Sequence, residues 1–279
     1  MLKLELLNCD FQVVEGQIDH EKESSPFFAT GERLCVLGIK DYVYQQGDKI
    51  RITVDLAEDG HYFVVQLDET LTPSLVYFAK AEWIFELSLL ENLRKVAVET
   101  TFASKRHCLM IRKAYDFEIV NIQNLSFNAH DQTNENAVFP HASSNVETEA
   151  TVFLAKNAID GKLANLSHGA YPFTSWGINR QENATLRIDF GRKVEVDRVN
   201  LLFRSDFPHD SYWEKLELAF SDDIRLDLTT KKTKEVQIFE FSPKITEFVE
   251  LRHLKKVKDD SDFPALTQIE VFGRNRRED

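Results

Sequence analysis

Alternation of apolar and polar residues with a period of two dominates this sequence. In the first half, DKIRITVDL places Ile50, Ile52, Val54 and Leu56 on one face, and HYFVVQLD, SLVYFA, EWIFEL and KVAVETTF follow at short intervals. Because successive side chains of a β-strand point to opposite faces of a sheet, this alternation predicts half-buried strands. The turn-forming stretches QQGD, AEDG and LTPS separate these segments. Short strands at regular spacing favour a β-sandwich or a barrel.

The second half repeats the same pattern. Apolar residues alternate in ATLRIDFG, VDRVNLLFR and KLELAFSD, and the segments VQIFEF, EFVELRHL and TQIEVFG follow. Only FLAKNAIDGK suggests a helical turn, and it is brief. The sequence therefore predicts an all-β protein with two jelly-roll-like sandwich domains.

A polar stretch separates the two patterned halves. Between residues 125 and 151 the chain is rich in Asn, Ser, Thr and His, and only a few apolar residues such as Phe127, Val138 and Phe139 offer something to bury. A chain of 279 residues is long enough for two ordinary β domains. We expect an N-terminal domain of unknown role at residues 1–130, an inter-domain strap at residues 131–150 and a second domain at residues 151–275.

Charge argues against two classes of partner. The formal net charge is -12, and residues 1–135 hold 13 basic against 22 acidic side chains. Neither half has the basic stripe that would neutralise phosphates, so nucleic acid and anionic membranes are disfavoured as partners. The apolar stretches are all shorter than the roughly 20 residues of a membrane span. The opening MLKLELLNCDFQVVEG alternates like a strand and not like a signal peptide, which favours a cytoplasmic location.

The cysteines predict free thiols. Cys9, Cys35 and Cys108 are odd in number, lie in the first half and form no C-x-x-C pair, so a disulfide framework or a zinc site is disfavoured. We expect all three thiols to be buried. Glycosylation sequons begin at Asn124, Asn165 and Asn183, and in a cytoplasmic protein they are chance matches.

The second half carries a resemblance to a known family. The ordered segments AKNAIDGK, SWGIN, LRIDFGRKVEVDRVNLLFR, LELAFSD and ALTQIEVFG resemble the discoidin, or coagulation-factor type C, branch of the galactose-binding-like fold. That branch includes the family 32 carbohydrate-binding modules. The match spans about residues 145–273, and DFPHDSYW and FPALTQIEV are similar to bacterial proteins described as carbohydrate-binding. The resemblance implies a jelly-roll sandwich whose end loops bind a glycan without catalysis.

The same resemblance implies a structural calcium ion. Asp160 matches the family's carboxylate ligand, and Thr174 or Ser175 matches its hydroxyl-bearing position. Oxygen ligands of this kind suit a hard cation. The family's ligand glutamate falls on Gln268, with Glu270 two residues further on, and an amide supplies no charge. The alternative is that Asp160 and Gly161 simply form a tight turn.

The stretch RSDFPHDSYW is the predicted sugar site. It follows the strand VNLLFR, and because Pro208 cannot donate to a strand ladder the chain leaves the sheet here as a loop. A sugar site needs hydrogen-bonding groups around an aromatic platform. From this loop the predicted ligand-binding residues are Arg204, Asp206, His209, Asp210, Tyr212 and Trp213. From the second loop, HGAYPFTSWGINR, they are His168, Tyr171, Trp176 and Arg180.

Structural roles compete with these assignments. Trp176 and Trp213 would serve equally as core aromatics, Arg204 and Asp206 as a structural ion pair, and Asp210 as a turn cap.

A protein of another class, an assembly module that holds a protein partner or a second copy of itself, would use the same aromatic loops. A glycosidase is disfavoured, because Asp206 and Asp210 lie only four residues apart on one loop. The eight histidines are scattered singly, which disfavours a metal hydrolase.

Overall fold

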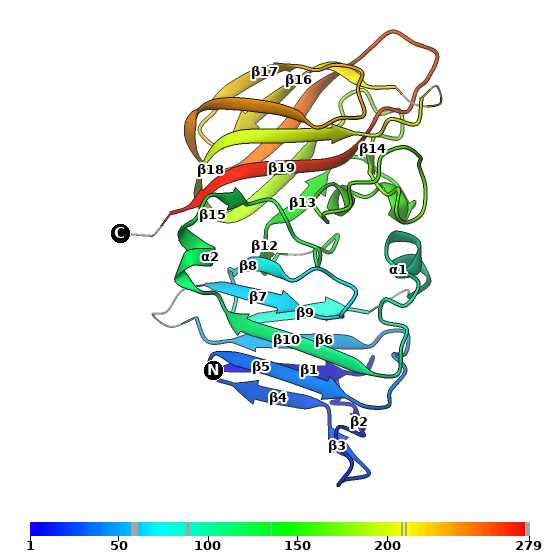
Figure 1. Cartoon of the computed structure of the whole chain (residues 1–279), viewed down its shortest axis with the longest axis vertical. Helices are drawn as coiled ribbons and strands as arrows, with labels where there is room; N and C mark the ends of the chain where they lie inside the picture. Colours follow the sequence, from blue (N-terminus) through cyan, green and yellow to red (C-terminus); the bar gives the residue numbers. More distant parts are fainter. Residues whose placement is uncertain (57–60, 88–89, 135, 208, 210, 277–279) are drawn as a thin grey trace. The chain divides into compact units, whose positions relative to one another are not determined.

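The computed structural model describes residues 1–56, 61–87, 90–134, 136–207, 209 and 211–276 (Figure 1). The chain forms two compact units. The first unit comprises Met1–Tyr115 and Asn136–Val138, and the second comprises Asp116–Glu135 and Phe139–Asp279. The division thus falls earlier than the boundary expected from the sequence, and it places most of the polar strap in the second unit.

The first unit is built from two sheets and a short ribbon (Figure 1). One sheet has the strand order β4-β1-β6-β9, the other has the order β12-β8-β7-β10-β5, and the ribbon pairs β2 with β3. The elements of this unit are β1 (Leu2–Leu7), β2 (Glu15–Gly16), β3 (Ser25–Pro26), β4 (Phe28–Gly31), β5 (Leu34–Ile39), β6 (Lys49–Val54), β7 (Tyr62–Gln66), β8 (Ser74–Phe78), β9 (Glu82–Glu86), α1 (Leu90–Val96), β10 (His107–Lys113) and β12 (Val138–Phe139), in which only Val138 belongs to the unit.

The period-two pattern sets the core of this unit. On β6 the side chains of Ile50, Ile52 and Val54 are buried, while the intervening residues are half-buried. Ile52 from one sheet and Ile111 from the other belong to a single hydrophobic cluster. The two sheets therefore pack face to face, and the predicted sandwich class is confirmed.

One predicted strand of the first unit is wrong. The segment KVAVETTF contains the end of α1 at Val96 and continues through turns. The residues of α1, LENLRKV, overlap the start of this segment and are mostly strong helix formers, which explains the helix. Val96 and Phe102 are both buried, so the apolar residues of this segment reach the core without a strand.

The three cysteines are free, and one of them is buried. Cys35 lies inside, whereas Cys9 and Cys108 are exposed, so the expectation that all three are buried is wrong. Cys108 lies between buried His107 and Leu109 on β10, and the alternation of a strand turns it outward. Within the described part of the chain, the helices are too short or too polar to span a membrane.

The second unit consists of one large antiparallel sheet with short elements packed against it (Figure 1). Its strand order is β11-β19-β15-β18-β16-β17, with β13 also paired to β15 and β14 to β19. Its elements are α2 (Asp116–Val120), β11 (Gln123–Asn124), β13 (His141–Ser144), the 3-10 turns η1 (Thr151–Phe153) and η2 (Ala155–Ala158), β14 (Trp176–Gly177), β15 (Leu186–Phe203), β16 (Trp213–Phe220), β17 (Arg225–Thr229), β18 (Gln237–Lys256) and β19 (Ala265–Asn275).

Long, bent strands let this sheet enclose its own core. The two alternating segments predicted within residues 186–203 form a single strand, β15, whose register against β18 shifts between Asp189 and Val194. Gly191 lies in this interruption with a φ of 66°, and a Cβ there would lie 2.3 Å from the Phe139 ring. A bulge of this kind bends a strand, so one strand contributes to both sides of the core. The helical turn predicted in FLAKNAIDGK is confirmed as η2.

The polar strap is ordered by its own hydrogen bonds. The carboxylate of Asp131 accepts from the backbone N–H of Ala142 at 2.8 Å and contacts Nδ1 of His141 at 2.8 Å. Asn128 Nδ2 donates to the carbonyl of Pro140 at 2.9 Å. Buried polar groups need such partners, which explains why this stretch is rich in Asn, Asp and His although it is part of a folded unit.

Candidate functional site

Three connections meet at one end of the second unit. Phe203, at the end of β15, pairs with Leu266, at the start of β19, and Leu266 also pairs with Trp176 of β14. Trp213, at the start of β16, pairs with Lys256, at the end of β18. We call the connections at this end, residues 163–175, 204–212 and 257–264, the end loops. The sequence predicted loops of this kind at the end of a sandwich.

Asn165 ties two of the end loops together. Its Nδ2 lies 2.9 Å from the carbonyl of Phe203, 2.9 Å from Oγ of Ser205 and 2.9 Å from the carbonyl of Lys234. The backbone N–H of Ser205 donates in return to the carbonyl of Asn165 at 2.7 Å. Because Asn165 is buried, these bonds are shielded from water and fix the loop backbones.

Arg204 supports the loops and does not face the solvent. Its side chain is buried, and its guanidinium donates through Nη2 to the carbonyl of Phe263. Its backbone N–H donates to the carbonyl of Ala265 at 3.0 Å. The prediction that Arg204 contacts a ligand is therefore corrected: its donors hold the loop before β19 in place.

His168 and Asp206 form a contact between two end loops. Nδ1 of His168 hydrogen-bonds to Oδ2 of Asp206, and the two side chains are 52% and 19% exposed. Both residues were predicted from the sequence as ligand-binding. The structure brings them together at the surface, so that a carboxylate and an imidazole from two end loops lie side by side.

The rest of the DFPHDSYW loop is held mainly by its backbone. His209 is exposed, its N–H donates to the carbonyl of Asp206 at 2.8 Å, and its carbonyl accepts from Oγ of Ser261 at 2.9 Å. Tyr212 is half-buried against the core. The predicted residue Asp210, like Pro208, lies outside the described residues.

The two predicted tryptophan platforms are core residues. Trp176 and Trp213 are each 1% exposed and belong to the hydrophobic core of the second unit. Trp213 also packs edge-to-face on Phe203, with ring centroids 5.5 Å apart. A ring with both faces covered cannot stack on a sugar, so the assignment of these two side chains to the ligand site is wrong.

Phe263 provides the exposed ring that the sequence analysis missed. It is 45% exposed, and the guanidinium of Arg180 lies over its face, 4.7 Å from the ring centroid. Nε of Arg180 is also 3.8 Å from Oδ2 of Asp262. The predicted residue Tyr171 is exposed on the first of the end loops. Exposed aromatic faces at this end are therefore supplied by Phe263 and Tyr171.

A repeated tetrapeptide is the signal that points to Phe263. The sequence SDFP occurs at residues 205–208 and again at residues 261–264, once in each of two end loops. In the first copy, Lys232 Nζ lies 4.3 Å from the ring centroid of Phe207, and in the second Arg180 lies over Phe263. Both copies thus place a cation on the phenylalanine face.

The neighbouring acidic group Asp259 is held ionised. Burial alone would raise its pKa, but hydrogen bonds from Lys256 and Ser211 hold the pKa of this carboxyl below its usual value. Lys256 Nζ donates to Oδ1 at 2.8 Å, and Oγ of Ser211 lies 2.9 Å from each carboxylate oxygen. This carboxylate therefore fixes the loop between β18 and β19 to the start of β16.

The predicted calcium donors do not fit a calcium ion. Oδ2 of Asp160 is 2.5 Å from the ammonium of Lys162, and Oδ1 accepts the backbone N–H of Lys162 at 3.0 Å. Oε1 of Gln268 accepts the N–H of Gly161 at 3.2 Å, while Glu270 accepts from Asn200 at 2.9 Å. Burial raises the pKa of Asp160, and Lys162 opposes that effect.

The other predicted donors are neutral hydroxyl groups. Oγ1 of Thr174 and Oγ of Ser175 are buried and have no hydrogen-bond partner within the described residues. Within the same residues, no cluster of three or more His, Cys, Asp or Glu side chains could hold a metal. Lys162 neutralises the carboxylate of Asp160 and Gln268 brings no charge, so this donor set offers little net negative charge to a hard divalent cation.

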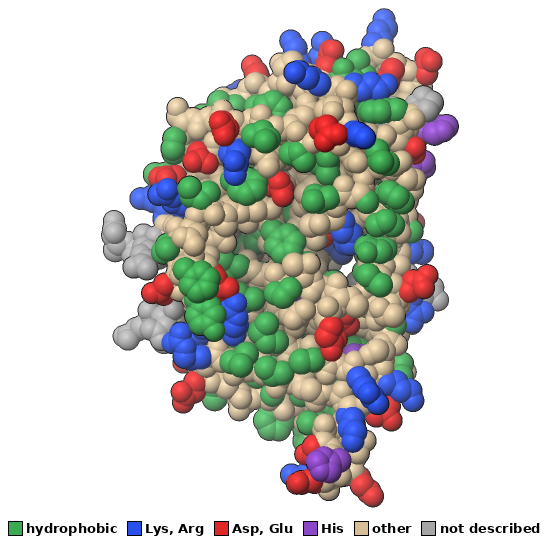
Figure 2. All heavy atoms as spheres, viewed as in Figure 1, with side chains coloured by type: hydrophobic (Ala, Val, Ile, Leu, Met, Phe, Trp, Pro, Cys, Tyr) green, Lys and Arg blue, Asp and Glu red, His purple; other side chains and the backbone are tan. Residues whose placement is uncertain are grey.

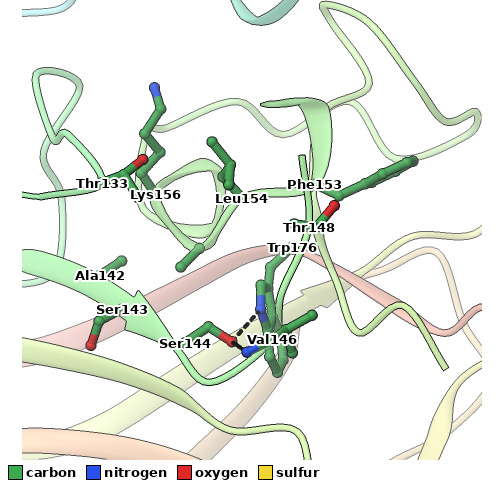
Figure 3. Close-up of a pocket in the computed structure, with 11 residues that line it drawn as sticks. Thr133, Ala142, Ser143, Ser144, Val146, Thr148, Phe153, Leu154, Lys156 and Trp176 are labelled. Carbon is green, nitrogen blue, oxygen red and sulfur yellow. Dashed lines mark hydrogen bonds between the residues drawn. The ribbon is translucent and has the colours of Figure 1, made fainter. Parts of the chain in front are cut away.

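A small cavity lies beside β13 and the 3-10 turns (Figure 3). Its volume is about 110 Å³, and its wall includes Ser144, Phe153, Lys156 and Trp176. Nε1 of Trp176 donates to Oγ of Ser144 at 3.1 Å, which satisfies the indole in the cavity wall. The only predicted ligand-binding residue among those lining it is Trp176, so this cavity is separate from the end loops.

Comparison with solved structures finds carbohydrate-binding modules. The family 32 module of C. perfringens NanJ in complex with galactose shares 20% identity over 47% of this chain and 91% of its own, with a TM-score of 0.37. The lectin domain of lectinolysin complexed with Lewis B antigen shares 19% identity over 55% of this chain and 98% of its own, with a TM-score of 0.41. Chitosan-binding module 1 from a Paenibacillus sp. IK-5 chitosanase/glucanase shares 17% identity over 54% of this chain and 100% of its own, with a TM-score of 0.38.

The sequence itself matches no described protein family. It also has no match among curated proteins. The similar modules are covered almost completely, whereas only about half of this chain is covered in each case. The sandwich architecture of both units is established independently by the strand pairing and the two hydrophobic cores.

Proposed function

We propose that the end loops of the second unit bind a glycan without catalysing its conversion. The observation that carries this proposal is the exposed Phe263 ring on loops that also present the His168–Asp206 pair at the surface. These loops are held together by the buried residues Asn165 and Arg204. Preorganised loops lose little conformational entropy when a ligand binds.

The chemistry of the exposed groups suits a sugar. The C–H face of a pyranose packs on an aromatic ring, and sugar hydroxyls donate to a carboxylate or accept from an imidazole. Phe263 supplies the ring, and Asp206 and His168 supply the polar contacts. A small polar ligand replaces good water contacts with protein contacts, so we expect affinity between millimolar and micromolar, about -4 to -8 kcal/mol.

A glycosidase is a poorer fit to these loops. Glycoside hydrolysis needs two carboxyl groups across the scissile bond, one of them protonated at working pH. In the described end loops, Asp206 contacts His168, Asp262 contacts Arg180 and Asp259 contacts Lys256. The pairing of these three carboxylates with basic groups favours binding and not acid catalysis.

A protein partner is the second candidate, and one observation favours it. Leu163 and Leu166, next to His168 in sequence, are exposed, as is Tyr171. Apolar side chains exposed on one loop, which we call the apolar patch, are suited to a protein-binding surface. Acidic and basic side chains are interspersed on the face shown in Figure 2, which disfavours a polyanion as the partner on that face.

The decisive experiment is a glycan-array screen of the purified chain, followed by calorimetric titration of the hits. Galactose and Lewis B are suitable first probes, because the NanJ module and the lectinolysin domain were solved with them. Chitotriose is a third, because chitosan-binding module 2 of the same Paenibacillus chitosanase/glucanase was solved with it. The double variant Leu163→Ser, Leu166→Ser separates the two candidates, since it removes the apolar patch and leaves the sugar contacts. A chain that binds none of the arrayed glycans contradicts the proposal.

A further inference from the structure

The turn at residues 160–162 holds a cation that belongs to the chain. Both oxygens of the Asp160 carboxylate are occupied by Lys162: Oδ1 accepts its backbone N–H at 3.0 Å, and Oδ2 contacts its ammonium at 2.5 Å. The side chains of Asp160 and Lys162 are only 10% and 21% exposed. The ion pair is therefore largely enclosed and weakly screened by solvent.

The turn is fixed on its other side by neutral contacts. The buried amide of Gln268 accepts the N–H of Gly161 at 3.2 Å and so ties the turn to β19. Gly161 has a φ of 82°, and a Cβ there would lie 2.6 Å from the Phe127 ring. Only glycine fits this position, so the backbone that carries Asp160 and Lys162 is closely constrained.

The charges around the turn leave no place for a divalent ion. Burial lowers the pKa of the nearby Lys156, and the positive charge of Lys162 lowers it further. Asp160 and Asp131 oppose these effects. A calcium ion at Asp160 would have to displace Lys162 and would meet the charge of Lys156, while Gln268 brings no compensating carboxylate.

We propose that the ammonium of Lys162 replaces a bound metal ion as the positive charge at the Asp160 turn, so that the second unit keeps its fold and its end loops without calcium. This inference does not rest on glycan binding. It follows from an enclosed ammonium–carboxylate pair, a neutral residue at Gln268 and a backbone that holds the pair in place.

Differential scanning calorimetry of the full chain tests the proposal. The parent protein should melt at the same temperature in millimolar calcium chloride and in EDTA, because an ion without a site cannot stabilise the fold by mass action. Lys162→Met should melt about 4 °C or more below the parent, and Lys162→Arg, which retains the charge, should stay close to the parent. A parent protein that calcium stabilises, or a Lys162→Met protein as stable as the parent, overturns the proposal.

A double variant designed to bind calcium at this turn gives a sharper test than the single substitutions. Lys162→Asn with Gln268→Glu removes the ammonium and adds a second carboxylate, and the buried hydroxyls of Thr174 and Ser175, the two other predicted donors, have no partner within the described residues. Calorimetric titration should detect calcium binding to this variant and none to the parent, and calcium should raise its melting temperature more than magnesium does. If the variant binds no calcium, the turn is not a cation position and the proposal is wrong.

Discussion

The indole rings of Trp176 and Trp213 pack against each other with their centroids 5.8 Å apart and their planes at 36°. Trp176 comes from β14 and Trp213 from the start of β16, so the contact joins strands that are not neighbours in the sheet. Both rings belong to the core directly beneath the end loops. The end loops therefore lie over an aromatic layer that is shielded from solvent.

Trp213→Ala should destabilise the protein and not simply remove a sugar contact. Truncating a buried tryptophan costs about 3–5 kcal/mol, because it removes apolar contacts and leaves a cavity. Urea unfolding followed by circular dichroism measures the loss. Tyr171→Ala, at an exposed aromatic of the end loops, is the control and should change stability by less than about 1 kcal/mol. Equal stability of the two variants would contradict the core assignment.

Phe263→Ala should weaken glycan binding about tenfold or more while the chain stays folded, because the ring is 45% exposed on the end loops and a sugar would pack on it. Phe28→Ala is a matched control: Phe28 is also 45% exposed and also carries a cation on its ring, with Lys3 Nζ 5.9 Å from the centroid, but it lies in the first unit. Calorimetric titration compares the two. If both variants bind as the parent does, Phe263 is not the platform.

Asp206→Ala should weaken binding of the glycan found on the array by about 10- to 150-fold, since losing a hydrogen bond to a charged group costs about 1.5–3 kcal/mol. A double-mutant cycle with His168→Ala measures the coupling between the two residues in the bound state. Lys232→Ala is unsuitable as the control because Lys232 lies over Phe207, which is next to Asp206 in the same loop. Unchanged affinity in both single variants would exclude the pair from the site.

Arg204→Met should loosen the loop before β19. The carbonyl of Phe263 loses a charged donor, and we expect a loss of about 1.5–3 kcal/mol in unfolding free energy. Binding should weaken as well, but through the displaced Phe263 ring. Amide hydrogen exchange of residues 261–265 should rise in Arg204→Met and stay at the parent level in Asp206→Ala. Unaltered exchange in Arg204→Met would show that the guanidinium does not hold this loop.

Acid should destabilise the protein through His130. Burial lowers the pKa of His130 from 6.5 to about 3, so the folded state keeps this imidazole neutral where the unfolded chain protonates it. Below about pH 6.5 the unfolded state binds the extra proton. The free energy of unfolding therefore falls as the pH drops towards 3, and this group contributes at most about 1.4 kcal/mol per pH unit to the fall. Urea unfolding at pH 7 and pH 5 should show a smaller loss for His130→Gln than for the parent. Identical pH slopes would contradict a neutral buried His130.

The period-two pattern predicted most of the strands, because the burial of one face of a strand appears directly in the sequence as alternating apolar and polar residues. Ile50, Ile52 and Val54 are all buried, as the pattern indicates. The union of two segments into β15 was not predictable, since the interruption at Gly191 is compatible with either a turn or a bulge, and Phe139, distant in sequence, decides between them.

The candidate site was predicted in outline and missed in detail. The position of His168 and Asp206 on end loops was predictable, because polar side chains beside a strand end belong to a loop however the core below is packed; their role in binding stays a prediction. Trp176 and Trp213 were assigned wrongly, because the burial of a tryptophan near a strand end depends on long-range contacts. Phe263 was overlooked although SDFP occurs twice, since the meaning of the repeat depends on both loops lying at one end of the sheet.

Each unit is formed from two separate segments of the chain, and this limits how the two units can be separated. Residues up to Tyr115 belong to the first unit and Asp116–Glu135 belong to the second. Asn136–Val138 belong to the first unit again, and the rest of the chain belongs to the second. A single cut anywhere therefore leaves one fragment carrying part of the other unit. A fragment that begins at Phe139 lacks Asp131, whose carboxylate holds Ala142, so dissecting this protein requires a circularly permuted or grafted chain and not a simple truncation.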